Sequence, residues 1–180
     1  MKYIEHSILL FQYYKDLGES SINQLNESQI RDNSTGNSIA IIVKHLSGNM
    51  ISRWTNFLSE DGEKSWRNRG AEFTDDFKNL DELWQFWQDG WDTLLTTLDS
   101  ISDDQLDQII FIRNEGHTVI EAINRQLAHY AYHIGQVVYI AKMHKKHDWN
   151  YLSIPPGKSD SYNAEKFYKE KKRSFFTKDI

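Results

Sequence analysis

Residues 126–136 read QLAHYAYHIGQ and place two histidines, His129 and His133, four positions apart. Apolar residues recur at helical spacing on both sides of this stretch, which predicts one long amphipathic helix. Positions i and i+4 of a helix lie one above the other on the same face, so the two imidazole rings can grip a single ion. The stretch therefore predicts a principal helix of the fold and a candidate metal-binding pair.

The histidine pair lies beside the apolar stripe of this helix. The stripe consists of Ile123, Leu127, Tyr130, Ile134, Val137 and Ala141. At about 100° per residue, the pair lies roughly 80–120° from the centre of the stripe. A residue at that angle faces the crevice shared with a neighbouring helix. Thr118 and Glu121 fit a capping box, which predicts that the helix starts there and runs to about Lys145.

Three further amphipathic stretches predict helices at about residues 1–25, 38–58 and 80–98. Asn37 is a good cap for the second of these helices. Its first half is apolar nearly all round, which is typical of a helix that is covered from more than one direction. The third carries the cleanest apolar stripe of the chain, rich in leucine and tryptophan.

The chain between the third and last helices breaks the helical pattern. QIIFIRNEGHTV, residues 108–119, combines a β-branched run with a turn-like Asn-Glu-Gly at 114–116, which predicts a small hairpin. No repeat or low-complexity linker interrupts the sequence. We therefore expect one all-α domain over residues 1–148, with a C-terminal extension, residues 149–180, that packs on it or trails from it.

The composition argues against several function classes. The net charge of −5 does not favour binding to nucleic acid, which requires a concentrated basic surface. The chain has no cysteine, so disulfides, thiolate ligands and a cysteine nucleophile are excluded. The N-terminal MKYIEHSILLFQYYKDL interrupts its apolar residues with polar and charged ones. We therefore expect neither a signal peptide nor a membrane span, and a cytoplasmic protein.

A third metal ligand is predicted on another helix. His45, in AIIVKHLSGNM, lies on the apolar first half of the helix at 38–58. Opposite His129 and His133 it would complete a three-nitrogen site with one coordination position open, as in catalytic metal centres. The alternative is that all three are ordinary surface or core histidines, because H-x-x-x-H is a short motif. Tyr130 replaces the glutamate of H-E-x-x-H, which argues against a zincin-type protease.

The sequence around these histidines resembles a known family. IIVKHLSGNMISRW, residues 41–54, and GHTVIEAINRQLAHYAYHIGQVVYIAK, residues 116–142, resemble the DinB/YfiT-like superfamily of small metalloenzymes. DGEKSWRNRGAEF and LSIPPGKS also look like an uncharacterised branch found in bacilli, and the likeness covers about residues 3–160. Its specific part is one histidine in the second helix and H-x-x-x-H followed by Gly-Gln in the fourth. Here these are His45, His129, His133, Gly135 and Gln136.

The resemblance implies a four-helix bundle of up-down-down-up connectivity. It also implies a divalent metal, zinc or nickel, that the three histidines hold at one end of a cleft. Characterised relatives are bacillithiol S-transferases and a mycothiol-dependent maleylpyruvate isomerase. The implied activity is transfer of a low-molecular-weight thiol to an electrophilic substrate, and a homodimer is the expected oligomer. A metal-hydroxide hydrolase, a non-catalytic metal- or ligand-binding stress-response bundle and a metal-free interaction module remain alternatives.

Four polar residues are candidates for substrate binding. Asn49 and Arg53 follow His45 by one and two helical turns, and Gln126 lies beside His129. Arg53 suits a substrate carboxylate, although a surface ion pair explains an arginine there equally well. Gln136 suits a partner that orients a ligand histidine or a bound water, with a capping role in the bundle as the alternative.

Overall fold

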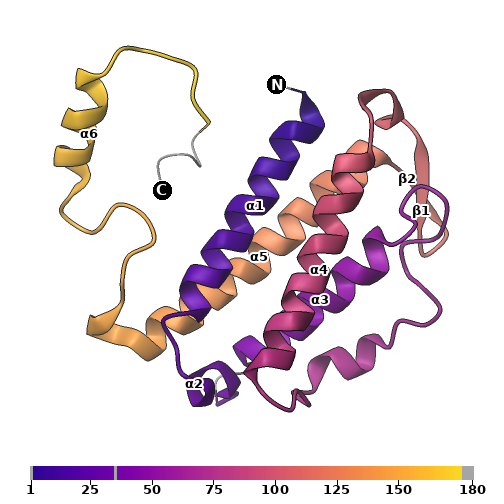
Figure 1. The fold of residues 1–180 in the computed structure, drawn as a ribbon, viewed down its shortest axis with the longest axis horizontal. Coiled ribbons are helices and arrows are strands. Elements are labelled where there is room, and N and C mark those ends of the chain that lie inside the picture. The colour runs from indigo at the N-terminus through magenta and orange to yellow at the C-terminus, as the bar shows by residue number, and fades with distance from the viewer. Residues whose placement is uncertain (1, 35, 176–180) are drawn as a thin grey trace.

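The computed structural model describes residues 2–34 and 36–175, and this part of the chain is mostly helical (Figure 1). Its elements are α1 (Tyr3–Ile22), α2 (Glu27–Arg31), α3 (Ile39–Trp54), α4 (Leu80–Ser100), β1 (Ile109–Ile112), β2 (Glu115–Thr118), α5 (Val119–Lys145) and α6 (Ser159–Tyr168). Short 3-10 helices lie at Arg69–Phe73 (η1), Asp103–Gln105 (η2) and Lys146–Asp148 (η3). The helical class and the small hairpin are confirmed.

The four long helices pack alongside one another around an aromatic core. α3 packs against α4 and α5, and α1 against α4 and α5 (Figure 1). The stripe of α4 supplies five fully buried side chains, Leu83, Trp87, Trp91, Leu94 and Leu98. Trp91 and Phe11 both pack against the ring of Tyr130, at centroid distances of 6.1 and 5.8 Å. The predicted helical spacing therefore identifies the core correctly.

The helix ends differ from the prediction at α3. Ser38, and not Asn37, is the N-cap, and its Oγ accepts a hydrogen bond from the Ile41 amide. The helix ends at Trp54 and does not reach residue 58, because Thr55 is extended and Asn56 adopts a positive φ of 49°. Asparagine tolerates this left-handed conformation better than most residues, so it terminates the helix without glycine.

The short helix α2 lies in a segment that the sequence pattern marks only as polar and turn-like. Asn26 caps it by accepting from the Gln29 amide, while the Gln29 side chain accepts from the Asn26 amide. Ile30 is its one buried residue.

By contrast, the predicted capping box of α5 is confirmed, with Thr118 Oγ1 and the Glu121 amide 3.2 Å apart.

The connection between α3 and α4 folds back over the C-terminal end of α3. Ser52 Oγ donates to the Gly62 carbonyl and accepts from the Lys64 amide. The hairpin attaches to the same connection, because Asp61 accepts from the backbone amides of Arg113 and Asn114. These two residues form the turn with φ values of 58° and 62°, one position earlier than predicted. The connection and the hairpin thereby reach the end of the groove between α3 and α5.

The C-terminal segment begins in the core and then leaves it. Trp149 is buried among the core residues, whereas α6 has no buried residue and stands apart from the long helices (Figure 1). Near the end of the described chain, the Phe175 ring meets His6 on α1 at 4.5 Å. The domain boundary at residue 148 stays a prediction. Within the described residues, no helix combines the length and the apolar character needed to cross a membrane.

Candidate metal centre

The structure brings the three predicted histidines together from two helices. His45 comes from α3, and His129 and His133 come from successive turns of α5. Their ring centroids lie 4.8–5.5 Å apart, and one nitrogen of each ring lies within 4.8 Å of the others. Nitrogens that share one zinc at about 2.1 Å lie about 3.4 Å apart, so modest side-chain rotation would close the three around an ion. The predicted convergence is therefore present.

The protonation of the cluster suits a cation. Burial, followed by the positive potential of His133 and His45, lowers the pKa of His129 to about 3. Burial also lowers the pKa of His133. Neutral imidazoles keep a lone pair for a metal, and a set of nitrogen ligands without thiolates suits zinc, nickel or copper. The residues present therefore fit a divalent transition metal.

Glu72 fixes the orientation of the His45 ring. Its Oε2 lies 2.9 Å from His45 Nδ1, and both side chains are less than 10% exposed, at 7% and 8%. Burial alone would raise the pKa of Glu72, but the hydrogen bonds from His45 and Arg67 outweigh it and hold the pKa below its usual value. An ionised carboxylate only accepts, so Nδ1 carries the proton and Nε2 keeps the lone pair. Carboxylates commonly support metal-binding histidines in this way.

Glu72 is itself held from two sides. Arg67 makes a forked pair with it, Nε to Oε1 at 2.7 Å and Nη2 to Oε2 at 2.9 Å. Gly48 on α3 leaves the space that the carboxylate fills, because a Cβ at this position would lie 2.7 Å from Glu72 Oε1. The Arg67 fork and the space left beside Gly48 together hold the Glu72 carboxylate against His45.

Gln136 supports the second histidine of the pair. Its Oε1 lies 2.9 Å from His133 Nδ1, one turn along α5. This contact gives His133 the same tautomer as His45, with Nε2 available for a ligand bond. Of the two uses considered for Gln136, the geometry favours orienting a ligand histidine.

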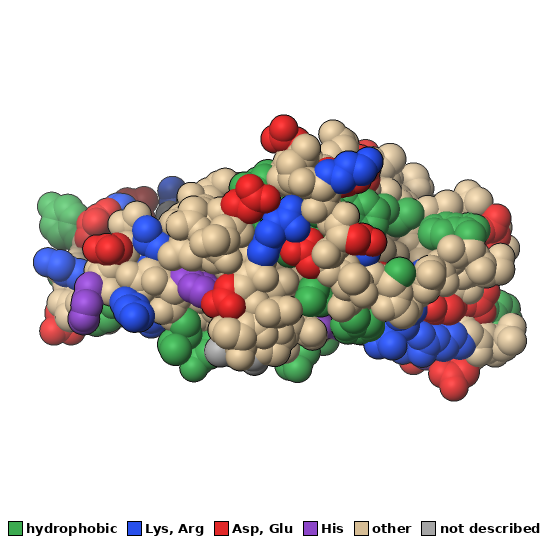
Figure 2. All heavy atoms as spheres, turned by 90° about the horizontal axis from the view of Figure 1, so that it is seen from below, with side chains coloured by type: hydrophobic (Ala, Val, Ile, Leu, Met, Phe, Trp, Pro, Cys, Tyr) green, Lys and Arg blue, Asp and Glu red, His purple; other side chains and the backbone are tan. Residues whose placement is uncertain are grey.

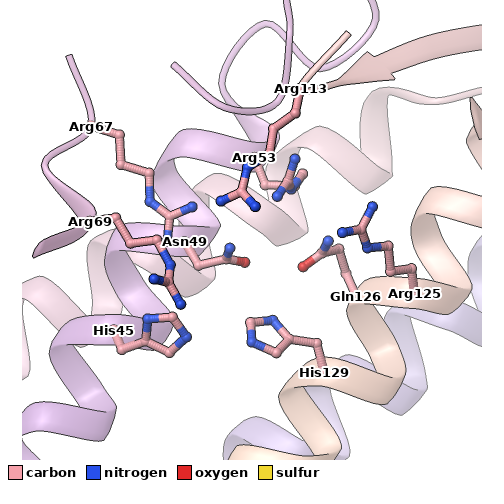
Figure 3. A pocket seen from close by; sticks show the side chains of 9 residues that line it. All are labelled: His45, Asn49, Arg53, Arg67, Arg69, Arg113, Arg125, Gln126 and His129. Carbon is pink, nitrogen blue, oxygen red and sulfur yellow. The ribbon is translucent and has the colours of Figure 1, made fainter. Parts of the chain in front are cut away.

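A cavity of about 250 Å³ opens beside the histidines (Figure 3). His45 and His129 lie at one end of it and face each other. Asn49, Arg53 and Gln126 line it, so three of the four candidate substrate residues reach one space. The structure does not bring Gln136 to this cavity.

Residues 1–158 match the model of a protein family described as a protein of unknown function, DUF1572. The chain belongs to the DUF1572 family. Among curated proteins, none matches the chain. The family match covers the long helices, the connection that carries Glu72 and the three histidines.

A buried polar chain supports the floor of the cavity in this DUF1572 protein. The Trp54 indole donates to the Tyr130 hydroxyl at 3.1 Å, and this hydroxyl donates to Asn49 Oδ1 at 3.0 Å. Burial raises the pKa of Tyr130, so the phenol stays protonated and keeps its donor role. The amide of Asn49 is thereby fixed with its nitrogen left to the cavity.

Sequence reasoning missed Glu72, Arg67 and Gly48 in this DUF1572 chain. Glu72 lies on η1, inside a connection without apolar periodicity, where one carboxylate among 26 acidic residues carries no signal. The available hint was the likeness of DGEKSWRNRGAEF to the bacillar branch, since this stretch contains both Arg67 and Glu72.

Proposed function

We propose that this DUF1572 protein is a divalent-metal-dependent enzyme that transfers a low-molecular-weight thiol to an electrophile. The convergence of three histidines beside a lined cavity carries the metal-dependent part of the proposal. The thiol part rests on the DinB/YfiT-like resemblance of the sequence around His45 and His129.

Three features support a reactive centre over a purely structural one. The protein offers three ligands, which leaves a coordination position for a substrate. His45 and His129 line the cavity, so this position is accessible from it. Glu72 holds Nδ1 of His45 and Gln136 holds Nδ1 of His133, which fixes these two rings before any substrate arrives.

A zinc or nickel ion in this site would keep its full charge and lower the pKa of a thiol or water bound to it. The protein's own contribution is positioning and charge. The guanidinium groups that line the cavity favour an anionic substrate there, and the amides of Asn49 and Gln126 can orient it. When the electrophile is an organic halide, the thiol sulfur bonds to the carbon that carries the halogen. The halide then leaves with the bonding electrons, and the thiol proton passes to solvent.

The finer features of the fold belong to the same proposal. The packing of α1, α3, α4 and α5 supports a DinB/YfiT-like bundle of up-down-down-up connectivity. A transferase of small thiols would act in the cytoplasm, where thiols are kept reduced. A homodimer, common among such bundles, completes the proposed assembly.

Turnover of bacillithiol with a chromogenic aryl halide tests the proposed function. We expect conjugation by the metal-loaded wild type and its loss in His129→Ala, whereas the exposed His147→Ala retains it. Thiol-dependent turnover that survives in His129→Ala would refute a role for the site. Hydrolysis of an activated ester without thiol, with no conjugation, would favour the hydrolase. Absence of both reactions from metal-loaded protein would favour a non-catalytic bundle.

A further inference from the structure

Arginine is concentrated in the cavity beside the histidines. The chain has seven arginines, and five of them, Arg53, Arg67, Arg69, Arg113 and Arg125, line this one space (Figure 3). Among the residues that the structure describes, no lysine and no carboxylate lines it. On the face shown in Figure 2, by contrast, acidic and basic side chains are interspersed. A protein of net charge −5 therefore gathers positive charge where a ligand would enter.

Arg53 is the most unusual member of this cluster. Its side chain is 5% exposed, and its Nε and Nη1 atoms are buried without a hydrogen-bond partner among the described residues. Its Nη2 lies 4.0 Å from Glu63 Oε2, too far for a hydrogen bond. Gly62 packs against the guanidinium, since a Cβ there would lie 2.6 Å from Nη1. Buried unpaired donors are costly, which points to a partner supplied by a ligand.

The remaining arginines divide into two groups. Arg67 and Arg113 share Glu63 as an ion-pair partner, at 3.0 and 3.3 Å, and Arg67 also holds Glu72. Arg69 and Arg125 make no ion pair within residues 2–34 and 36–175. Arg69 stacks over the Phe73 ring at 5.2 Å, and Arg125 Nη1 lies 3.4 Å from His117 Nε2. Both side chains are exposed and reach the cavity from opposite walls (Figure 3).

We propose that this cavity binds the oxyanion group, carboxylate or phosphate, of a small anionic substrate through Arg53, Arg69 and Arg125. The planar fork of arginine matches both oxyanions in a bidentate manner, which explains why the cavity uses arginine and no lysine. An oxyanion would satisfy the donors of Arg53 and relieve the repulsion among neighbouring guanidinium groups. This assignment rests on the proposed function, because it treats the space beside the histidines as the substrate site.

The position of the cluster also sets the shape of the substrate. Arg53, Arg113 and Arg125 lie at the end of the cavity away from His45 and His129, while the Arg69 side chain points toward His45 (Figure 3). An oxyanion at the end lined by arginines would anchor the substrate while its reactive group reaches the histidines. At about 250 Å³ the cavity is below the roughly 300–1,000 Å³ typical of drug-sized ligands. Gln126 Oε1, also buried without a partner among the described residues, offers a further polar contact. The substrate class is therefore a compact anion with a polar body.

Calorimetric titration of the purified, metal-loaded protein with inorganic phosphate and with succinate tests the assignment. We expect at least one probe to bind with a Kd below about 1 mM. Arg125→Gln should weaken this binding about tenfold or more, because it removes a charge-assisted contact. Arg53→Lys, which keeps the charge but removes the fork, should weaken it as well. Binding of succinate alone would identify a carboxylate substrate, and binding of phosphate alone a phosphorylated one.

Two variants separate this inference from the proposed function. Arg173→Gln removes an equal charge on the exposed C-terminal segment and should bind the probes as the wild type does. His133→Ala removes a candidate metal ligand that does not line the cavity, so it should lose metal and keep probe binding. Failure of both probes to bind the wild type, or equal affinity in Arg125→Gln and Arg173→Gln, would overturn the anion site. Probe binding to a protein that holds no metal would support it and contradict the proposed function alone.

Discussion

Glu72 is not one of the candidate metal ligands, but its hydrogen bond to Nδ1 of His45 sets the direction in which Nε2 of that ring points. We expect Glu72→Gln to lower metal affinity about 10- to 100-fold, as the loss of such supporting carboxylates does elsewhere. The amide can still accept from Nδ1, but it lacks the charge that polarises the ring and pairs with Arg67. Competition with a chromogenic chelator measures the affinity. Glu63→Gln, which removes a carboxylate on the other side of Arg67, should have a much smaller effect.

Gly48→Ala reaches the same contact without changing a polar group. The added Cβ would lie 2.7 Å from Glu72 Oε1, so the carboxylate must move away from His45. Metal affinity should fall in the same direction as for Glu72→Gln. Gly135→Ala is the matched control, because nothing lies within 4 Å of its added Cβ. Equal metal affinity in both alanine variants and the wild type would show that Glu72 does not support the site.

The ligand residues could be predicted at this scale, and their supports could not. Helical spacing identifies His129 and His133 as candidates, and the position of His45 on an apolar helix identifies the third. The orientation of His45 depends on η1, whose position follows from tertiary contacts between the connection and α3. Periodicity carries no information about such a segment. Of the arginine cluster only Arg53 was predicted, because Arg67, Arg69 and Arg113 come from the connection and the hairpin, whose positions follow from tertiary contacts.

Among the elements, α1 and α4 are joined by a partly buried carboxylate. Glu19 Oε1 accepts from Lys15 Nζ at 2.6 Å and from Trp87 Nε1 and Gln88 Nε2 at 3.0 Å each. Burial alone would raise the pKa of Glu19, but these hydrogen bonds hold it below its usual 4.5. The stability contribution of Glu19 is therefore present above about pH 4.5 and lost as the pH falls through the lower folded-state pKa.

Urea unfolding of the wild type and Glu19→Gln between pH 3 and 7 tests this link. At neutral pH we expect the variant to be less stable by roughly 1–3 kcal/mol, the usual effect of losing hydrogen bonds to a charged group. The difference should shrink as the solution becomes acidic and the wild-type carboxylate gains its proton. A difference that stays constant over the whole range would contradict the assigned ionisation.

The contact between α3 and α4 depends on a glycine. A Cβ at Gly90 would lie 2.8 Å from the backbone Cα of Ser47, which cannot move aside as a flexible side chain can. Gly90→Ala should therefore destabilise the protein by about 1–3 kcal/mol, the range of overpacking effects. Gly135→Ala, on the exposed face of α5, should instead stabilise it by up to about 1 kcal/mol through helix propensity. Thermal unfolding of both variants measures the contrast.

Sequence patterns predicted the long helices well because burial and periodicity agree there. α4 and α5 have the predicted apolar stripes, and both keep close to their predicted limits. The short α2 was missed because five residues do not establish a helical period, and the burial of Ile30 and the Asn26 cap stabilise it instead. The early end of α3 likewise depends on the conformation of a single asparagine.

For the whole molecule, the C-terminal segment should be dispensable for the metal centre. α6 has no buried residue, and Phe175 is the one buried residue after position 158 in the described chain. Burial of one such ring is worth at most about 3 kcal/mol. A chain that ends after Lys158 should therefore fold, unfold cooperatively at a somewhat lower temperature and bind metal as the full chain does. Circular dichroism melting and metal analysis check this, and loss of metal from the folded truncated chain would contradict it.

Total charge describes this molecule poorly. A net charge of −5 predicts little affinity for anions, yet five arginines converge beside the histidines. Composition averages over the surface, whereas binding depends on the local field in a cavity of low dielectric constant. The positive charge of the cavity therefore depends on where the fold places its arginines. They come from five parts of the chain: α3, the connection before η1, η1 itself, the hairpin turn and α5.

Elemental analysis of untagged protein tests the central claim most directly, with the wild type beside His45→Ala, His129→Ala and His133→Ala. If three imidazoles from α3 and α5 bind one divalent cation, the wild type holds about one zinc or nickel per chain, and each folded variant loses most of it. Wild-type protein that carries no stoichiometric metal after growth and refolding in zinc or nickel, or a His45→Ala variant with undiminished metal, would contradict the account.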